Sequence, residues 1–127
     1  MSCYWDTLIK EIRNNDIKLI LELNNPNPQL FASKLKLKNK LVNTIICNNN
    51  KLSSKQQEEN YEHIKEYDIN QANNGYLCST CDPFLILIAD LFSITIINNY
   101  DSNKIIYKPI AISRYEITIN NNKGHMW

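Results

Sequence analysis

The sequence has 127 residues, of which 43% are hydrophobic, and its fourteen basic and thirteen acidic residues almost cancel. This length suits one domain with a modest core and leaves no room for a second independent domain, so we expect residues 1–127 to form a single domain. The lysines are scattered rather than gathered into a basic stripe, which argues against nucleic-acid binding as the main activity.

The hydrophobic segments and the cysteines set expectations about the compartment. The longest hydrophobic run, 84–89, is far shorter than the roughly 20 residues that span a bilayer, and the first residues lack the pattern of a secretory signal. We therefore expect a soluble cytoplasmic protein with no membrane partner and with four cysteines kept as thiols. The abundance of asparagine, isoleucine and lysine is typical of an AT-rich genome, such as that of a large DNA virus, for which the compartment would be the host cytoplasm.

Apolar residues at helical spacing predict a first helix that begins at Cys3. Its apolar face consists of Trp5, Leu8, Ile9 and Ile12. A second short helix is predicted in "NNDIKLILEL", with a cap at Asn15 or Asp16, and the two prolines of "NNPNP" must end it. The cysteine thus lies at the N-terminal end of the first helix.

The middle of the sequence is predicted to be mainly helical. "QLFASKLKLKNKLVNTIIC" has helical spacing in its first half, whereas its end, "LVNTIIC", equally suits a buried strand. The following segment matches the reciprocal capping pattern of a helix start, with either Ser53 and Gln56 or Ser54 and Gln57. "NNGYLCST" is predicted to be a loop.

The last third changes from helix to strand. Asp82 can cap a helix over "PFLILIADLF", which is apolar on almost every side and is predicted to be the central core helix. "SITIINNY", "KIIYKPIAI" and "YEITINNN" predict three antiparallel strands, with Pro109 limiting the middle one to an edge or a bend. We therefore expect an α+β fold in which N-terminal helices pack on a small C-terminal antiparallel sheet.

Cys3 and His125 are the candidate catalytic residues. A thiol is a strong nucleophile only as the thiolate, which the N-terminus of a helix favours. His125 follows the last predicted strand, and an imidazole facing the thiol would form the nucleophile–base pair of thiol proteases. In papain-like folds, the cysteine lies at the start of a helix and faces a histidine at the end of a strand. The structural alternatives are a small buried cysteine and a solvated terminal histidine.

Several segments in the same order resemble the ovarian-tumour (OTU) family of deubiquitinating cysteine proteases. "CYWDTLIKEI" resembles the nucleophile helix of that family, and "EENYEHIKEYD" its helix with a Glu-Tyr segment. "GYLCSTCDPFLILIADLFSITIIN" is similar to its succession of glycine, loop, apolar helix and strand, and "YEITINNNKGHMW" to its terminal strand and histidine loop. The resemblance covers most of the chain.

This resemblance implies a papain-related OTU-like fold and hydrolysis of peptide or isopeptide bonds at the C-terminus of ubiquitin or a ubiquitin-like protein. Cys3 would be the nucleophile and His125 the general base, with no cofactor or metal, in a protein expected to be a monomer. Family members carry a loop such as Asp-Gly-Asn before the cysteine, where this sequence has Met1 and Ser2. The backbone amides of Ser2 and Cys3 are the expected oxyanion donors.

The third member of the catalytic triad is not assigned. Many family members carry a polar orienting residue two positions after the histidine, and this sequence has Trp127 there. The alternative candidates for orienting the imidazole are the side chains of Asn120, Asn121 and Asn122.

Two other functions compete with catalysis. One is a catalytically inactive OTU-like module that binds ubiquitin or another partner. The other is a zinc-stabilised interaction domain, because Cys78 and Cys81 have the spacing of a zinc half-site, with Cys3, Cys47, His63 and His125 as the remaining candidate ligands. The same spacing occurs in redox pairs. The structural alternative is that both cysteines pack in the loop before the core helix, with His63 on a solvated helix surface.

Overall fold

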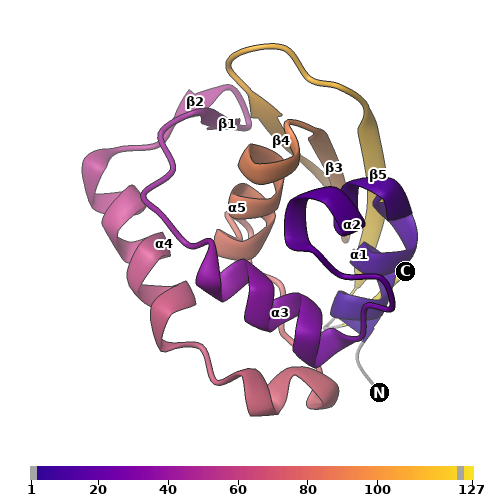
Figure 1. Cartoon of the computed structure of the whole chain (residues 1–127). Helices are drawn as coiled ribbons and strands as arrows, with labels where there is room; N and C mark the ends of the chain where they lie inside the picture. Colours follow the sequence, from indigo (N-terminus) through magenta and orange to yellow (C-terminus); the bar gives the residue numbers. More distant parts are fainter. Residues whose placement is uncertain (1–2, 123–124) are drawn as a thin grey trace.

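The computed structural model describes residues 3–122 and 125–127, which form helices packed against one mixed sheet (Figure 1). The helices are α1 (Cys3–Glu11), α2 (Asn14–Leu21), α3 (Pro28–Leu37), α4 (Ser54–Glu66), the 3-10 helix η1 (Ile69–Asn74) and α5 (Pro83–Phe92). The strands are β1 (Ile45–Cys47), β2 (Asn50–Lys51), β3 (Thr95–Tyr100), β4 (Asn103–Pro109), β5 (Glu116–Asn122) and β6 (His125–Met126). The predicted α+β class is confirmed.

Local capping chemistry explains where α4 and α5 begin. The Ser53 hydroxyl accepts a hydrogen bond from the Gln56 amide, and the Gln56 side chain accepts one from the Ser53 amide, which completes a capping box. Asp82 accepts from the Phe84 amide at the start of α5, and Pro83 occupies the first turn. Both starts were predicted from the sequence.

The predicted cap of α2 is wrong. Arg13 occupies the cap position and makes no side-chain capping bond there. Asp16 is instead buried, and its carboxylate accepts hydrogen bonds from the Arg114 guanidinium at 2.9 and 3.2 Å and from the Tyr115 hydroxyl at 2.6 Å. The Asp16 carboxylate therefore binds Arg114, which lies 98 residues later in the sequence, and does not cap α2.

The sheet has the strand order β2-β1-β4-β3-β5-β6 over the described residues. Its pairs are antiparallel except β3 and β5, which are parallel, so the predicted antiparallel sheet is wrong in that respect. The reason lies in β1, which pairs with the far edge of β4. Because that edge is taken, β5 cannot pair with β4, and it pairs with the free side of β3 instead.

Pro109 does not mark an edge strand, but the chain bends directly after it, at residues 110–111, which is the other outcome that the sequence predicted. β4 lies inside the sheet between β1 and β3, and Pro109 is its last residue, paired with Ile45. A proline lacks a backbone donor, so its place at the end of an internal strand costs the ladder little. "LVNTIIC", which was predicted to be either helix or strand, ends in strand β1.

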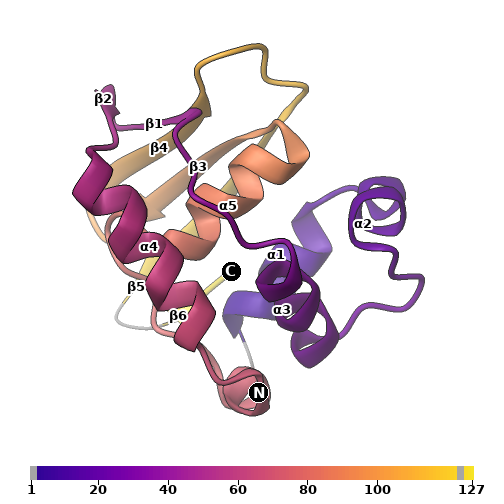
Figure 2. The ribbon, with the colours of Figure 1, turned by 60° about the vertical axis from the view of Figure 1, so that its left-hand side comes forward.

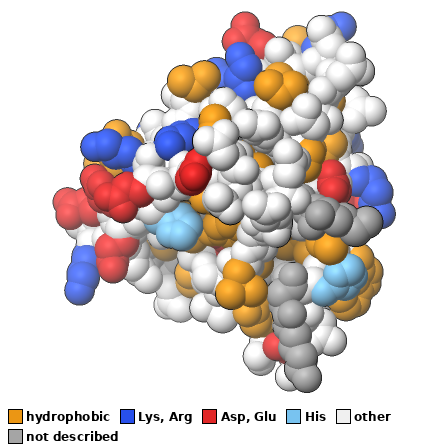
Figure 3. Space-filling model, turned by 90° about the horizontal axis from the view of Figure 1, so that it is seen from below, with side chains coloured by type: hydrophobic (Ala, Val, Ile, Leu, Met, Phe, Trp, Pro, Cys, Tyr) orange, Lys and Arg blue, Asp and Glu red, His pale blue; other side chains and the backbone are white. Residues whose placement is uncertain are grey.

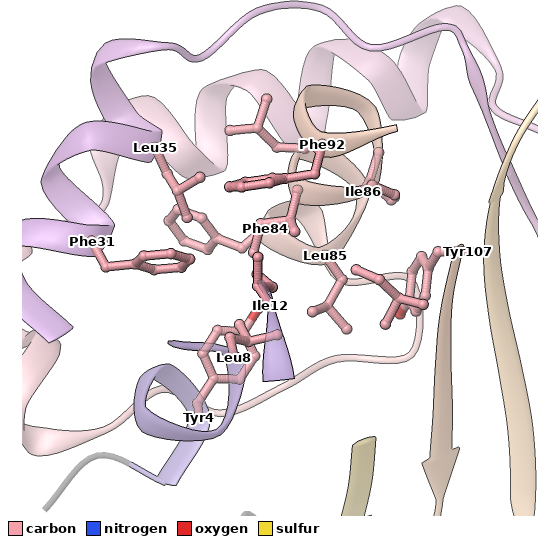
Figure 4. Packing of buried hydrophobic residues seen from close by; sticks show 14 of the residues in the cluster. Tyr4, Leu8, Ile12, Phe31, Leu35, Phe84, Leu85, Ile86, Phe92 and Tyr107 are labelled. Atoms are coloured by element: carbon pink, nitrogen blue, oxygen red, sulfur yellow. The ribbon is translucent and has the colours of Figure 1, made fainter. Parts of the chain in front are cut away.

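The central core helix is α5, as predicted. Residues 83–89 and Phe92 are buried, and the helix runs between the sheet and the other helices (Figures 1 and 2). In Figure 4, Phe84 and Leu85 of α5 point toward Tyr4 and Leu8 of α1. Trp5 is fully buried, with its ring edge-on to Phe84 at 5.0 Å between centroids, so the core anchors the first helix.

In the part of the chain that the structure describes, every helix is too short or too polar to cross a membrane.

Candidate active site

The first helix and the last strand bring the two ends of the described chain together. The Sγ of Cys3, in the first turn of α1, lies 3.2 Å from the Nδ1 of His125 in β6. The thiol is half-buried and the imidazole is exposed. The histidine side chains lie on one face of the molecule, each beside hydrophobic side chains (Figure 3). The separation is that of a nucleophile and its base within hydrogen-bond reach.

Three residues that follow Cys3 hold α1 in place. Trp5 packs in the core, and the Tyr4 hydroxyl donates to the carboxylate of Asp82 at 2.6 Å. The Thr7 hydroxyl donates to the backbone carbonyl of Met126 at 3.3 Å, one residue beyond the histidine. This last bond joins the nucleophile helix directly to the strand that carries the imidazole, so it helps fix the distance between sulfur and ring.

Strand β6 fixes the direction of the imidazole. It pairs with β5 so that Asn122 lies opposite His125 and Asn121 lies opposite Met126. The ladder continues at Trp127, whose amide and carbonyl exchange 2.9 Å hydrogen bonds with Asn120. Side chains alternate along a strand, so Met126 turns into the core while His125 and Trp127 share the outer face.

Trp127 stacks on His125. The ring centroids are 5.5 Å apart and the ring planes are inclined by 28°. Such an offset stack restricts rotation of the imidazole about its side-chain bonds. The sequence indicated only that Trp127 cannot serve as the polar orienting residue of the family. The contact between the two rings was missed, although two aromatic residues separated by one position on a strand are a signal that their side chains share a face.

The three asparagines considered as a third triad member are placed differently. The Asn120 side chain accepts from Asn99 at 3.1 Å, and the Asn121 side chain donates to Asn98 at 3.0 Å in the interior. Asn122 is exposed and lies directly across the ladder from His125, so its side chain is on the same face as the imidazole. Asn122 is therefore the asparagine placed nearest to the required position.

The predicted oxyanion donors fall partly outside the described residues. Ser2 lies outside them, as do Lys123 and Gly124, which precede the histidine. The Cys3 amide is in the first turn of α1, where backbone amides have no partner within the helix. It is thus free of helical hydrogen bonding and lies next to the thiol, as an oxyanion donor must.

A buried polar cluster lies behind the nucleophile helix. The Asp82 carboxylate is fully buried and accepts from Tyr4, from the Tyr76 hydroxyl at 2.9 Å and from the Cys78 thiol at 3.4 Å. Burial raises the pKa of Asp82, and the hydrogen bonds from Tyr4, Tyr76 and Cys78 oppose that rise. The sequence identified Asp82 only as a helix cap, because Tyr4 comes from the start of the chain and Tyr76 and Cys78 lie in a loop whose conformation the sequence does not specify.

The cysteines of the "CSTC" motif point to different partners. Cys78 is buried, and its thiol donates a hydrogen bond to Asp82. Burial and the nearby Asp82 carboxylate raise the pKa of Cys78 above the usual range for a thiol. Cys81 is exposed, and its sulfur lies 2.8 Å from that of Cys47. All four cysteines are free thiols. Within residues 3–122 and 125–127 no three His, Cys, Asp or Glu side chains are grouped as a metal site requires, so the zinc-site alternative has no support there.

His63 lies on the exposed side of α4, as predicted, but it is not isolated. Its Nε2 lies 2.9 Å from the Tyr76 hydroxyl, which in turn donates to Asp82. Through Tyr76, His63 belongs to the edge of the buried cluster.

Comparison with known proteins provides no relative for this arrangement. No protein-family model, curated protein or solved structure matches the chain.

Proposed function

We propose that this protein is an OTU-like cysteine protease that hydrolyses peptide or isopeptide bonds at the C-terminus of ubiquitin or a ubiquitin-like protein. The observation that carries the proposal is the 3.2 Å distance between the Cys3 sulfur and the His125 ring nitrogen, formed between the opening of a helix and the last strand of a sheet. The substrate class comes from the resemblance of the sequence segments to the OTU family. A papain-related fold is part of the same proposal.

The chemistry follows from the two side chains. His125 accepts the thiol proton, and the Cys3 thiolate attacks the carbonyl carbon of the scissile bond to give a tetrahedral oxyanion. His125 then donates its proton to the leaving amine, which leaves an acyl group bound to the sulfur as a thioester. A water molecule that gives its proton to His125 attacks the thioester, the bond between carbon and sulfur breaks, and His125 returns the proton to the sulfur. This regenerates the thiol and releases the new C-terminal carboxylic acid.

The surroundings of the pair support turnover by positioning the reacting groups. The Cys3 amide is the described candidate for stabilising the oxyanion, and in well-studied proteases one such donor is worth about 3–4 kcal/mol. Trp127 restricts the imidazole by stacking, and Asn122 lies on the same face across the ladder. Trp127 and Asn122 are positioning residues in this proposal, because they act on His125 and not on the substrate.

A ubiquitin probe with a thiol-reactive group at its C-terminus tests the proposal. The wild-type protein is expected to be labelled at Cys3, with the labelled residue identified by peptide mapping, and Cys3→Ala is expected to remain unlabelled. His125→Ala should be labelled about 10³-fold more slowly, within the roughly 10²–10⁴-fold that general acid–base catalysis contributes. His63→Ala is the matched control, since it removes the other histidine, and it should be labelled at the wild-type rate.

The alternative is an OTU-like module that binds ubiquitin without cleaving it. The specific observation in its favour is that the candidate orienting groups are a tryptophan and an asparagine for which no hydrogen bond to His125 is seen among the described residues. Retained binding of ubiquitin by wild-type protein that the probe does not label would establish this alternative. Labelling that persists in Cys3→Ala would overturn the proposed nucleophile.

A further inference from the structure

Cys47 and Cys81 form a second close pair of side chains, and neither lies in the elements that carry Cys3 and His125. Their sulfurs lie 2.8 Å apart although the residues are 34 positions apart in the sequence. A disulfide bond is about 2.0 Å long, so the gap that separates these thiols from a bond is less than about 1 Å. The fold has therefore already brought the two sulfurs almost to bonding distance.

The elements that carry the pair are firmly placed. Cys47 is the last residue of β1, where it pairs with Tyr107 of the internal strand β4. The Tyr107 hydroxyl donates to the carbonyl of Thr80, the residue before Cys81, at 2.8 Å, and accepts from the Asp82 amide, on its other side, at 3.1 Å. One tyrosine thus holds the loop that carries Cys81 against the strand that neighbours Cys47.

The two thiols differ in access. Cys47 is buried, whereas Cys81 is exposed. Cys81 also lines a surface pocket of about 300 Å³ together with Thr80, Asn103 and Lys104. A small molecule can therefore reach the sulfur of Cys81 from solvent. The buried sulfur of Cys47 lies 2.8 Å from it.

Cys78, the other possible partner of Cys81, already makes hydrogen bonds of its own. The Cys78 thiol donates to the Asp82 carboxylate at 3.4 Å, and it accepts from the Asn98 side chain at 3.6 Å in the interior. Burial and the neighbouring carboxylate keep this thiol protonated by raising its pKa. The spacing of the motif points to a bond between Cys78 and Cys81, and the fold offers Cys81 a different partner.

We propose that Cys47 and Cys81 are a redox site, which closes to an intramolecular disulfide on reaction with a small-molecule disulfide. The Cys81 thiolate attacks one sulfur of that molecule, forms a mixed disulfide and releases one thiol. The Cys47 thiolate, after loss of its proton to solvent, attacks the Cys81 sulfur and releases the second thiol. Two protein thiols are oxidised to one disulfide, and one external disulfide is reduced to two thiols.

The product would join β1 to the loop that leads into α5. Restricting a long segment of the unfolded chain in this way raises stability. The burial that raises the pKa of Cys47 to about 12 makes the second attack the slower step. An external thiol should reverse the bond by attacking the exposed Cys81 sulfur, because thiol–disulfide exchange runs in both directions. The reactivity of Cys3 should be unchanged, because the disulfide uses neither Cys3 nor His125.

Oxidised glutathione is the probe, applied to the full-length wild-type protein. After acid quenching and alkylation of free thiols, trypsin separates Cys47, in residues 41–51, from Cys78 and Cys81, in residues 66–104. The expected product is a cross-link between these two peptides in a protein that remains monomeric on a non-reducing gel, with a raised melting temperature that dithiothreitol returns to its original value.

The variants separate the possible partners. Cys78→Ser should keep the cross-link, and Cys81→Ser, a change at an exposed position, should lose it. Cys47→Ser should lose it too, leaving a stable glutathione adduct at Cys81. A bond within peptide 66–104, a cross-link that survives in Cys81→Ser, a cross-link only between two copies of the chain, or free thiols throughout would each overturn the proposal. None of these results bears on labelling of Cys3 by the ubiquitin probe.

Discussion

Cys3 and Cys47 each have a close polar neighbour among the described residues, and the two neighbours favour different reactions. Cys3 is half-buried beside an imidazole, a group that can accept its proton. Cys47 is buried beside another thiol, which cannot act as a base at neutral pH. Hydrolysis needs a base held next to the sulfur, whereas disulfide formation needs a second sulfur. The comparison teaches that the partner and the burial of a cysteine, more than its presence in a motif, decide what it can do.

The largest expected effect concerns the rate of alkylation by iodoacetamide at neutral pH. Burial, together with the neighbouring Cys81 thiol, raises the pKa of Cys47 to about 12. Because only the thiolate reacts, Cys47 should be alkylated about 10³-fold more slowly than an unperturbed thiol. The raised pKa also means that its rate should rise about tenfold for each pH unit up to that value. Mass spectrometry of peptide 41–51 over time measures this rate.

The exposed Cys81 is the internal control for alkylation. It is measured in the same protein and the same solution as Cys47. Because Cys81 is exposed, it should react well before Cys47 does. Equal rates for the two cysteines in the folded protein would show that Cys47 is not buried as described, and the contrast with Cys3 would then fail.

The next largest effect should come from the buried cluster that anchors the nucleophile helix. Tyr4→Phe removes a 2.6 Å hydrogen bond to the fully buried Asp82 carboxylate. The expected loss in free energy of unfolding is about 1–3 kcal/mol, because a buried acceptor loses one of its donors. Chemical denaturation measures the loss. Tyr100→Phe is the matched control, since its hydroxyl donates to a backbone carbonyl at 3.3 Å from a half-buried ring, and it should cost less.

The loss of stability caused by Tyr4→Phe should depend on pH, and the direction of that dependence can be predicted. Burial raises the pKa of Asp82, so the folded state holds this proton more tightly than the unfolded state. The contribution of Asp82 to stability is therefore fully present below its unfolded pKa and is lost as the pH rises through its folded value. Tyr4→Phe removes a donor that opposes the rise, so the penalty of the substitution should grow with pH. A penalty that shrinks as pH rises would contradict the assigned role of Tyr4.

Local signals were enough to predict most helices and the residues of β3, β4 and β5, whereas the short strand β6, which carries His125, was not predicted. The Ser53 capping box, the Asp82 cap and the apolar run of α5 are each contained within a few neighbouring residues, and each was predicted correctly. Sheet topology is not local. The parallel pairing of β3 with β5 follows from the position of β1, which comes from the middle of the chain, and no pattern within 93–122 contains that information.

The candidate site divides in the same way. Residue type, helix start and strand end were enough to select Cys3 and His125, and the structure brings their side chains together, while their catalytic role stays a prediction. The choice among three consecutive asparagines required the β5–β6 register. The pairing of Cys81 with Cys47 could not be derived either, because the nearby Cys78 satisfies the motif spacing, and only the fold shows that its thiol faces Asp82.

The smallest expected effect tests whether stacking can replace a polar orienting residue. Trp127 is 52% exposed, and its amide and carbonyl are bonded to Asn120, so Trp127→Ala should keep the strand and leave the melting temperature nearly unchanged. The imidazole would lose the ring that restricts its rotation. We expect the rate of probe labelling at Cys3 to fall about tenfold, which is less than the roughly 10²-fold that a 1 Å misplacement of a catalytic group can cost. Trp127→Phe retains a stacking ring and should recover most of the rate. If Trp127→Ala and Trp127→Phe were labelled equally slowly, the indole would be acting through some other contact, and Asn122 would become the leading candidate for orienting His125.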